Sequence, residues 1–159
     1  MMKRRTLAVL ALTTLITILT ATPGLLAAQS SSGGIQWLDY AEGRQRSAAE
    51  NKKVFLIFEA DWCRYCLQME KETFQDPTVI AYVNRNFVPI RVDSDRQQDI
   101  ASAYGVRGLP STWFIAADGN RIVNRPGYIA ADELLHILKY IGSDSYLTMS
   151  FKDFVENGP

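Results

Sequence analysis

The stretch VFLIFEADWCRYCLQME, residues 54–70, carries the features that decide the fold. Its first seven residues, Val54–Ala60, are apolar apart from Glu59 and rich in β-branched and aromatic side chains, which predicts a buried central strand. A helix is expected to begin near Cys63, so the chain's two cysteines, Cys63 and Cys66, lie where a strand passes into a helix. In open α/β sheets, this carboxyl end of a strand is the usual position of a ligand or reactive group.

The segments that follow alternate between helix and strand patterns. Asp76-Pro77 is typical of a helix start, because Asp caps the first turn and Pro fits the first helical position. The remaining expected elements are a strand at 87–93, a short helix ending at Gly105, a hairpin at 111–125 and an amphipathic helix at 131–142.

Both ends of the folded part are expected to add helices. Trp37, Tyr40 and Ala41 predict a helical face that continues through Ala48, and aromatic residues at 146, 151 and 154 predict a short C-terminal helix. We therefore expect one α/β domain over residues 35–159, with a central mixed β-sheet, helices on both faces and helical extensions at both ends.

The first 28 residues have the pattern of a secretory signal. Three basic residues at 3–5 precede an uncharged stretch, Thr6–Ala28, which ends in small residues. We expect cleavage after Ala28, with residues 29–34 as a flexible lead-in. An uncleaved membrane anchor is the alternative, because 23 uncharged residues are long enough to span a bilayer.

The charge pattern excludes one class of partner. The chain has 17 basic and 17 acidic residues, and the part that follows residue 28 has a formal net charge of −3. The two signs are interspersed and form no basic stripe, so nucleic-acid binding is not expected.

The cysteine pair allows three interpretations. A structural disulfide is a weak one, because a cross-link stabilises a fold less when the loop that it closes is short. A zinc site usually needs about four ligands, and the chain's single histidine, His136, lies far along the sequence at an expected exposed position. A Cu(I) site needs only two thiolates, so a copper carrier remains an alternative.

A redox role has the strongest physical basis. A sulfur at the start of a helix lies near unpaired backbone N–H groups and the positive end of the helix dipole, which both favour the thiolate. The thiolate is the form that attacks disulfides, and the neighbouring Arg64 favours it further. Cys63 is then expected to attack a partner's disulfide, and Cys66 to displace the partner.

The stretch GVRGLPST, residues 105–112, carries a second signal. Pro110 follows Leu109 and precedes a predicted strand, which is a favourable position for a cis peptide bond. An ordinary trans turn is the alternative. A cis Leu109–Pro110 bond would leave the backbone polar groups of Leu109 free to pair with an extended substrate chain.

These two motifs together resemble the thioredoxin family. FEADWCRYC (58–66) is similar to the family's strand followed by WCxxC, and GVRGLPSTWFIAADG (105–119) is similar to its cis-proline loop and following strand. Within the family, the chain resembles the C-terminal periplasmic domain of DsbD-type membrane disulfide reductases and the small SoxW-type periplasmic thioredoxins. The resemblance implies the thioredoxin fold, a cis Pro110 and disulfide exchange through the two cysteines.

The chain departs from the family at one buried acid. Thioredoxins carry it on the strand before the first cysteine, where this chain has Ile57. Glu59 lies on the same strand face, and Glu70 lies one helical turn after Cys66, where DsbD-type domains also carry a glutamate. Glu59 and Glu70 are therefore the candidates for the proton acceptor that helps Cys66 attack, with a solvated surface role as the alternative.

The expected substrate-binding residues surround the cysteines. They are Trp62, Arg64, Tyr65, Leu109 and Pro110. Trp62 is expected to shield the disulfide and contact partners, with core packing as the alternative. Tyr65 lacks the charge that a histidine offers to a thiolate, which argues against a strong oxidant.

The sequence thus predicts an exported thiol–disulfide oxidoreductase that works in the periplasm as a monomeric reductant, with the Cys63–Cys66 dithiol in place of any cofactor or metal. The expected electron donor is a DsbD-type membrane reductase. The expected substrates are exported proteins with disulfides, such as cytochrome c apoproteins or sulfur-oxidation components. A disulfide oxidase or isomerase, and a non-catalytic copper or apoprotein carrier, are the alternatives.

Overall fold

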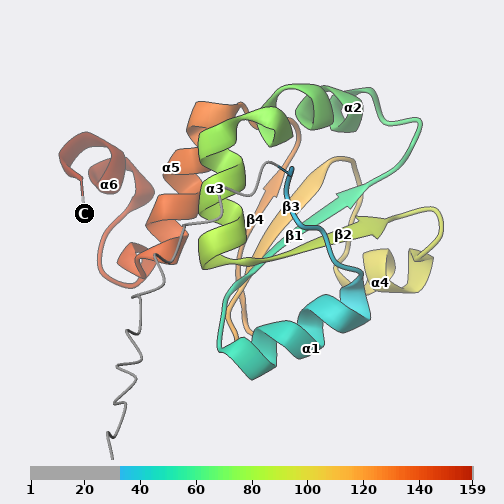
Figure 1. The fold of residues 1–159 in the computed structure, drawn as a ribbon, viewed down its shortest axis with the longest axis horizontal. Coiled ribbons are helices and arrows are strands. Elements are labelled where there is room, and N and C mark those ends of the chain that lie inside the picture. The colour runs from blue at the N-terminus through green and yellow to red at the C-terminus, as the bar shows by residue number, and fades with distance from the viewer. Residues whose placement is uncertain (1–32, 159) are drawn as a thin grey trace, which may run out of the picture. The chain divides into compact units, whose positions relative to one another are not determined.

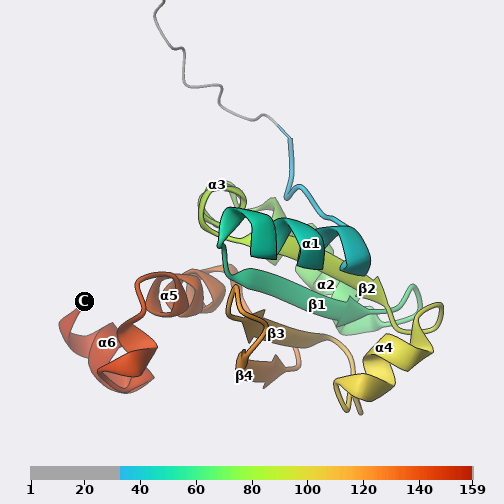
Figure 2. The same ribbon diagram turned by 90° about the horizontal axis from the view of Figure 1, so that it is seen from below.

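The computed structural model describes residues 33–158, so the predicted signal (1–28) and most of the predicted lead-in (29–34) lie outside the described residues. Figures 1 and 2 both show α5 and α6 at one end of the molecule and α4 at the other. In chain order, the elements are α1 (Tyr40–Glu50), β1 (Val54–Glu59), α2 (Arg64–Lys71), the 3-10 helix η1 (Thr73–Gln75), α3 (Pro77–Asn86), β2 (Val88–Asp93), α4 (Gln98–Ala103), β3 (Ser111–Ile115), β4 (Arg121–Pro126), α5 (Ala131–Gly142), the 3-10 helix η2 (Ser145–Leu147) and α6 (Phe151–Asn157).

The four strands form one mixed sheet in the order β2-β1-β3-β4. β1 pairs with β2 in parallel and with β3 in antiparallel, and β3 pairs with β4 as a hairpin. The predicted central strand is thus confirmed, since β1 has a hydrogen-bonded neighbour on each side and its first five residues are fully buried.

Side chains alternate between two cores, one on each face of the sheet. Phe55 and Ile57 of β1 belong to the core that α3 and α5 cover, together with Val83 and Leu138. Val54, Leu56 and Phe58 point into the other core, where they meet Ala101 of α4 and the partly buried Tyr40 of α1. The prediction of a mixed sheet with helices on both faces is confirmed.

The segment before α1 covers the outer edge of β2. Leu38 N–H donates to the Pro89 carbonyl at 3.0 Å, and Arg91 N–H donates to the Leu38 carbonyl at 3.1 Å. An uncovered edge strand is a template for unwanted pairing with another chain. Trp37, one residue earlier, packs its ring against Phe55 and Phe74 of the core.

The helix predicted from Trp37, Tyr40 and Ala41 through Ala48 is present as α1, and Tyr40 packs against the core, but the rest of the predicted face is wrong. Trp37 lies outside α1, and both alanines are exposed. The buried residues of α1 are Gly43 and Ser47. A Cβ atom on Gly43 would lie 2.3 Å from Cγ1 of Ile90, so glycine here is what lets α1 approach β2 closely.

The other predicted helix signals are confirmed. Asp76 caps α3 by accepting hydrogen bonds from the N–H groups of Thr78 and Val79, with Pro77 at the first helical position. The C-terminal extension packs on the body through Tyr140, whose ring contacts Phe151 and Phe154 at centroid distances of 5.4 and 5.3 Å.

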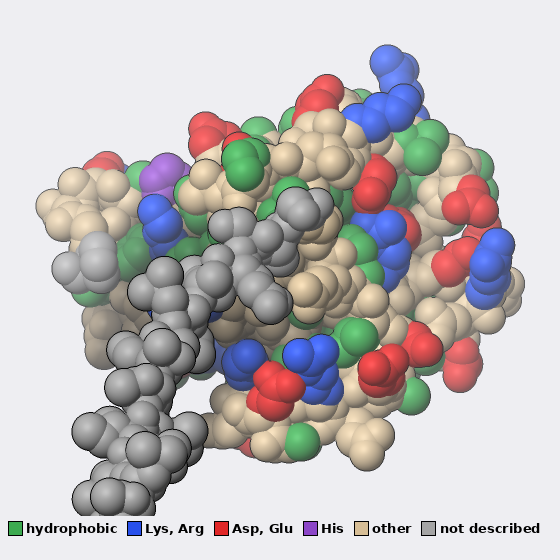
Figure 3. All heavy atoms as spheres, viewed as in Figure 1, with side chains coloured by type: hydrophobic (Ala, Val, Ile, Leu, Met, Phe, Trp, Pro, Cys, Tyr) green, Lys and Arg blue, Asp and Glu red, His purple; other side chains and the backbone are tan. Residues whose placement is uncertain are grey.

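The surface matches the expected mixture of charges. On the face that Figure 3 shows, acidic and basic side chains are interspersed. Of the helices within residues 33–158, none combines the length and apolar character that crossing a membrane requires.

Candidate active site

The two cysteines form a disulfide at the start of α2. Their Cα atoms are 5.2 Å apart, and Cys63 is the N-cap residue whose sulfur accepts a hydrogen bond from Cys66 N–H at 3.2 Å. The predicted helix start is therefore confirmed to one residue. In the reduced protein, this position places the Cys63 sulfur against unpaired N–H groups and the positive end of the helix dipole, which favour the thiolate.

The cis-proline loop lies against the disulfide. The Leu109–Pro110 bond is cis, as predicted, and the Leu109 side chain packs on Cys63 and Cys66 together with Ala60. Within residues 33–158, the backbone N–H and carbonyl of Leu109 have no backbone hydrogen-bond partner. The loop can therefore pair with the extended backbone of a second chain beside the disulfide.

Exposed apolar side chains surround this point. Trp62 is 70% exposed and Tyr65 is 57% exposed, so the core-packing alternative for Trp62 is wrong. The Trp62 indole N–H donates to Asp95 at 2.7 Å, which holds the ring beside the disulfide. The exposed Arg64 follows Cys63 directly as the first residue of α2.

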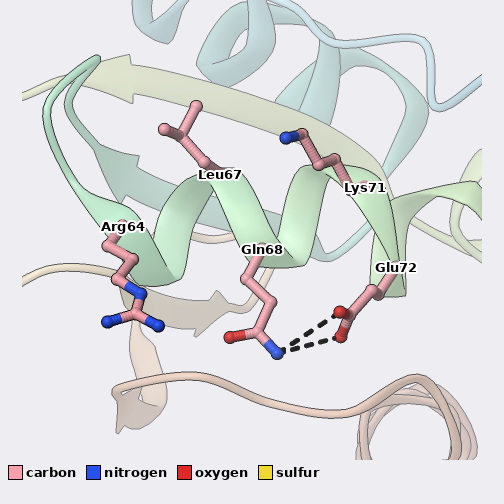
Figure 4. A pocket seen from close by; sticks show the side chains of 5 residues that line it. All are labelled: Arg64, Leu67, Gln68, Lys71 and Glu72. Carbon is pink, nitrogen blue, oxygen red and sulfur yellow. Dashed lines mark hydrogen bonds between the residues drawn. The ribbon is translucent and has the colours of Figure 1, made fainter.

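A shallow hollow of about 380 Å³ continues this surface along the outer side of α2 (Figure 4). Its lining residues are Arg64, Leu67, Gln68, Lys71 and Glu72. The Gln68 amide donates to the Glu72 carboxylate, which also accepts a hydrogen bond from the Tyr128 hydroxyl at 2.7 Å. This hollow is not predictable from the sequence, because the approach of Tyr128 to α2 is a tertiary contact.

The two candidate acids meet at an arginine that the sequence analysis did not single out. Arg91 of β2 donates a hydrogen bond from Nη2 to Glu70, and its Nε lies 3.3 Å from Oε1 of Glu59. We call Glu59, Glu70 and Arg91 the acid–arginine cluster. The side chain of Glu59 is only 20% exposed and that of Glu70 is 43% exposed. Glu59 is therefore not a freely solvated residue, whereas Glu70 keeps a partly exposed carboxylate that is paired with Arg91.

Burial dominates the electrostatics of Glu59. Loss of water around its carboxyl group raises the pKa above the ordinary value, and Arg91 opposes that shift. Glu70, Asp61 and Asp93 each raise the pKa a little further, because a neighbouring negative charge disfavours ionisation. Glu59 is therefore a carboxyl group that takes up a proton more readily than an exposed glutamate does.

Metal ligands are scarce around the disulfide. Within residues 33–158, no three side chains of the His, Cys, Asp and Glu types are arranged to hold a metal ion. His136 is exposed on α5, as the sequence analysis expected.

Comparison with known proteins gives the same family from sequence and from structure. A family profile described as a thioredoxin-like domain matches residues 40–142. The thioredoxin of Borreliella burgdorferi is 30% identical over 105 residues, which are 66% of this chain and 86% of that protein. The thiol:disulfide interchange protein DsbD of Vibrio vulnificus is 37% identical over 98 residues, which are 58% of this chain but only 16% of that protein.

Solved structures agree. A thioredoxin from Thermus thermophilus superposes with a TM-score of 0.62 at 27% identity, over 67% of this chain and 86% of that one. The C-terminal domain of Neisseria meningitidis DsbD in its reduced form superposes with a TM-score of 0.53 at 28% identity, over 62% of this chain and 90% of that one. The chain therefore belongs to the thioredoxin-like family of disulfide oxidoreductases, and it carries a Cys63–Cys66 disulfide at the start of α2.

Proposed function

We propose that the protein is an exported reductase that breaks disulfides in other exported proteins by cycling Cys63 and Cys66 between dithiol and disulfide. One observation carries this proposal: Cys63 caps α2 directly beside a cis-proline loop with free backbone groups. A reactive sulfur and a docking strand therefore lie side by side.

The exchange takes place in two steps. In the reduced protein, the Cys63 thiolate attacks one sulfur of the substrate disulfide, so that a mixed disulfide forms and one substrate thiolate leaves. Cys66 then loses its proton and attacks the Cys63 sulfur, which breaks the mixed disulfide and releases the second substrate thiolate. Two electrons pass from the dithiol to the substrate, and the Cys63–Cys66 bond remains.

Substrate binding falls to the surface around the disulfide. The free backbone groups of Leu109 pair with the substrate chain, and Pro110 in its cis form turns them outward. Trp62 and Tyr65 offer apolar contact area next to the reacting sulfurs. Arg64 adds a positive charge that favours the Cys63 thiolate.

Glu59 and Glu70 are the proposed proton acceptors for Cys66. Glu70 lies one helical turn from Cys66, and the Glu59 strand leads into Ala60, which packs on both cysteines. No other acid on this strand face lies nearer in sequence to the missing family carboxylate at Ile57. Glu59 takes up protons readily because burial raises its pKa.

The reducing direction and the periplasmic location rest on similarity and on the sequence. Relatives include the disulfide bond reductase DsbH of Chlamydia pneumoniae, which is 25% identical over 104 residues, 58% of this chain and 63% of that protein. The signal-like segment 1–28, cleaved or kept as an anchor, would deliver the domain outside the cytoplasm. A DsbD-type membrane reductase would then recharge it, and cytochrome c apoproteins or sulfur-oxidation components are the proposed substrates of this monomer.

Insulin reduction and a trapping variant test the proposal together. The wild-type protein, supplied with dithiothreitol, is expected to speed insulin precipitation, and Cys63→Ser to fall to the dithiothreitol background. In the native host, Cys66→Ala should accumulate mixed disulfides between Cys63 and exported proteins, because the second step is blocked. Full insulin reduction by Cys63→Ser would disprove the mechanism, and metal bound to the purified reduced protein would favour the carrier alternative.

A further inference from the structure

Arg91 lies beside Ile57, the position at which the chain departs from its family. In the parallel register of β1 and β2, Arg91 is the direct partner of Ile57. Adjacent partners point to the same face of a sheet. The chain therefore has no carboxylate at Ile57 and instead brings a guanidinium to the neighbouring strand, on the same face as Glu59.

We propose that Arg91 is a positioning residue of the redox site, which holds the Glu59 and Glu70 carboxylates together behind Cys66 and keeps them ready to receive its proton. This inference deepens the proposed function and rests on its disulfide exchange. Nothing in the sequence pattern assigns Arg91 this role, because it depends on the pairing of β1 with β2.

The contacts of Arg91 fix its guanidinium on three sides. Nη2 bonds to Glu70, and Nε approaches Glu59 to 3.3 Å without the angle of a hydrogen bond. The Trp37 ring lies over the guanidinium carbon, at 4.5 Å from its centroid. A planar guanidinium can face two carboxylates and stack on an aromatic ring at once, which a lysine ammonium cannot do.

The acid–arginine cluster is linked to the second cysteine through α2 and through the end of β1. Glu70 follows Cys66 by four residues in α2, a spacing that places two Cβ atoms about 5–6 Å apart on one helix face. Glu59 immediately precedes Ala60, which belongs to the same buried cluster as Cys66. Arg91 itself reaches α2 through Glu70, so it acts on Cys66 through the two acids.

The charges around the cluster explain why a cation is needed. Besides Glu70, Glu59 faces Asp61 from the loop after β1 and Asp93 from β2. These negative groups and burial all favour the protonated carboxyl, and a carboxyl that already holds a proton cannot accept the one from Cys66. Arg91 is the strongest of the charges acting on Glu59 and opposes them, while Arg96 pairs with Asp93 at 3.0 Å and lies 3.9 Å from Asp61.

The pH dependence of the second exchange step tests this role. The reduced protein is mixed with 5,5′-dithiobis(2-nitrobenzoate), whose disulfide Cys63 attacks, releasing one coloured thiolate. Cys66 then releases the second one as the Cys63–Cys66 disulfide forms. The rate of this second release, followed by stopped flow against pH, reports how easily Cys66 loses its proton.

Arg91→Met is expected to move the midpoint of this pH profile upward by about one unit, because a cation beside a carboxyl group typically lowers the pKa by about 1–3 units. Arg91→Lys keeps the charge but loses the double contact, so a smaller upward shift is expected. The matched control is Arg125→Met, which breaks the Arg125–Glu133 ion pair at the opposite edge of the sheet and should leave the midpoint unchanged.

A second comparison separates action through the acids from a general effect. In a Glu59→Gln/Glu70→Gln background, Arg91→Met should cause no further shift. An unshifted midpoint in Arg91→Met would overturn the proposal, as would an equal shift in the double-glutamine background. If Arg91→Met does not fold, Arg91→Lys decides, and an unshifted midpoint in that variant overturns the proposal. If wild type shows no second release at all, disulfide exchange itself fails, and that outcome is distinct from an unshifted midpoint.

Discussion

The two edge strands of the sheet each carry an arginine that bonds to a glutamate from a helix. On β2, Arg91 bonds to Glu70 of α2, and on β4, Arg125 bonds to Glu133 of α5. The residue types are the same, but the surroundings differ. The side chain of Arg91 is 28% exposed and lies under Trp37, whereas that of Arg125 is 46% exposed.

The difference lies in burial and in the number of carboxylates. Arg125 has one partner in the described chain, and exposed ion pairs contribute about 0–1 kcal/mol to stability. Arg91 faces two carboxylates in a partly buried site next to α2. Two Arg–Glu pairs of the same residue types therefore differ in their expected contribution to stability. The pair that is shielded by an aromatic ring and lies next to α2 is expected to contribute more than the exposed pair on β4.

The largest expected effect is on stability at the β2 edge. Arg91→Met should lower the free energy of unfolding of the oxidised protein by about 2 kcal/mol, because it leaves two partly buried carboxylates without their cation. Arg125→Met should change it by less than about 0.5 kcal/mol. Urea unfolding, followed by circular dichroism, measures both. Equal losses in the two variants would break the comparison.

The second prediction concerns the close packing of α1 on β2. Gly43→Ala should cost about 1–2 kcal/mol, because its new methyl group would overlap the buried Ile90 side chain and force α1 away from the edge strand. The better helix propensity of alanine offsets part of this cost. The matched control is Gly34→Ala, whose Cβ would meet no atom within 4 Å. The melting temperatures of the two variants measure this cost. A Gly43→Ala variant that melts at the wild-type temperature would contradict the close packing of Gly43 on Ile90.

The smallest expected effect is a pH-dependent gain in the free energy of unfolding from Glu59→Gln. Because burial raises the pKa of Glu59, the folded protein keeps this proton at pH values where the unfolded chain has released it. The contribution of Glu59 to wild-type stability therefore falls as pH rises from its unfolded pKa through its folded one, and glutamine avoids that loss. The variant should match wild type near pH 3 and exceed it by less than about 1 kcal/mol at pH 7.

Urea unfolding at the two pH values measures this difference. Glu133→Gln, which removes the matching glutamate at the other edge, should show at most the small loss of a surface ion pair. A Glu59→Gln variant that is less stable than wild type at pH 7 would show that the attraction of Arg91 outweighs burial, contrary to the direction of the Glu59 pKa shift.

Local chemistry made most of the fold predictable. The apolar run at β1, the Asp76-Pro77 helix start and the cis-proline motif each depend on neighbouring residues, and all three occur where the sequence analysis placed them. Apart from Tyr40, the predicted face of α1 was wrong because its burial depends on how closely Gly43 can approach Ile90, and that packing does not follow from hydrophobic periodicity.

The residues of the candidate site that follow from local sequence patterns were predictable, and the one that depends on tertiary contacts was not. Cys63 and Cys66 could be identified from their spacing, and Glu59 and Glu70 from strand and helix periodicity. Arg91 could not, because its partners come from two other elements and are brought together by the parallel register of β1 and β2. A charged residue inside the apolar run 87–93 was the signal present in the sequence.

The equilibrium redox potential of the Cys63–Cys66 pair tests the central claim most directly. The protein is equilibrated in dithiothreitol buffers of graded potential, and the oxidised fraction is counted by mass after the free thiols are alkylated. A reductase should give a value near that of thioredoxin, about −270 mV. A value near that of the oxidant DsbA, about −120 mV, would contradict the reducing direction proposed for this protein.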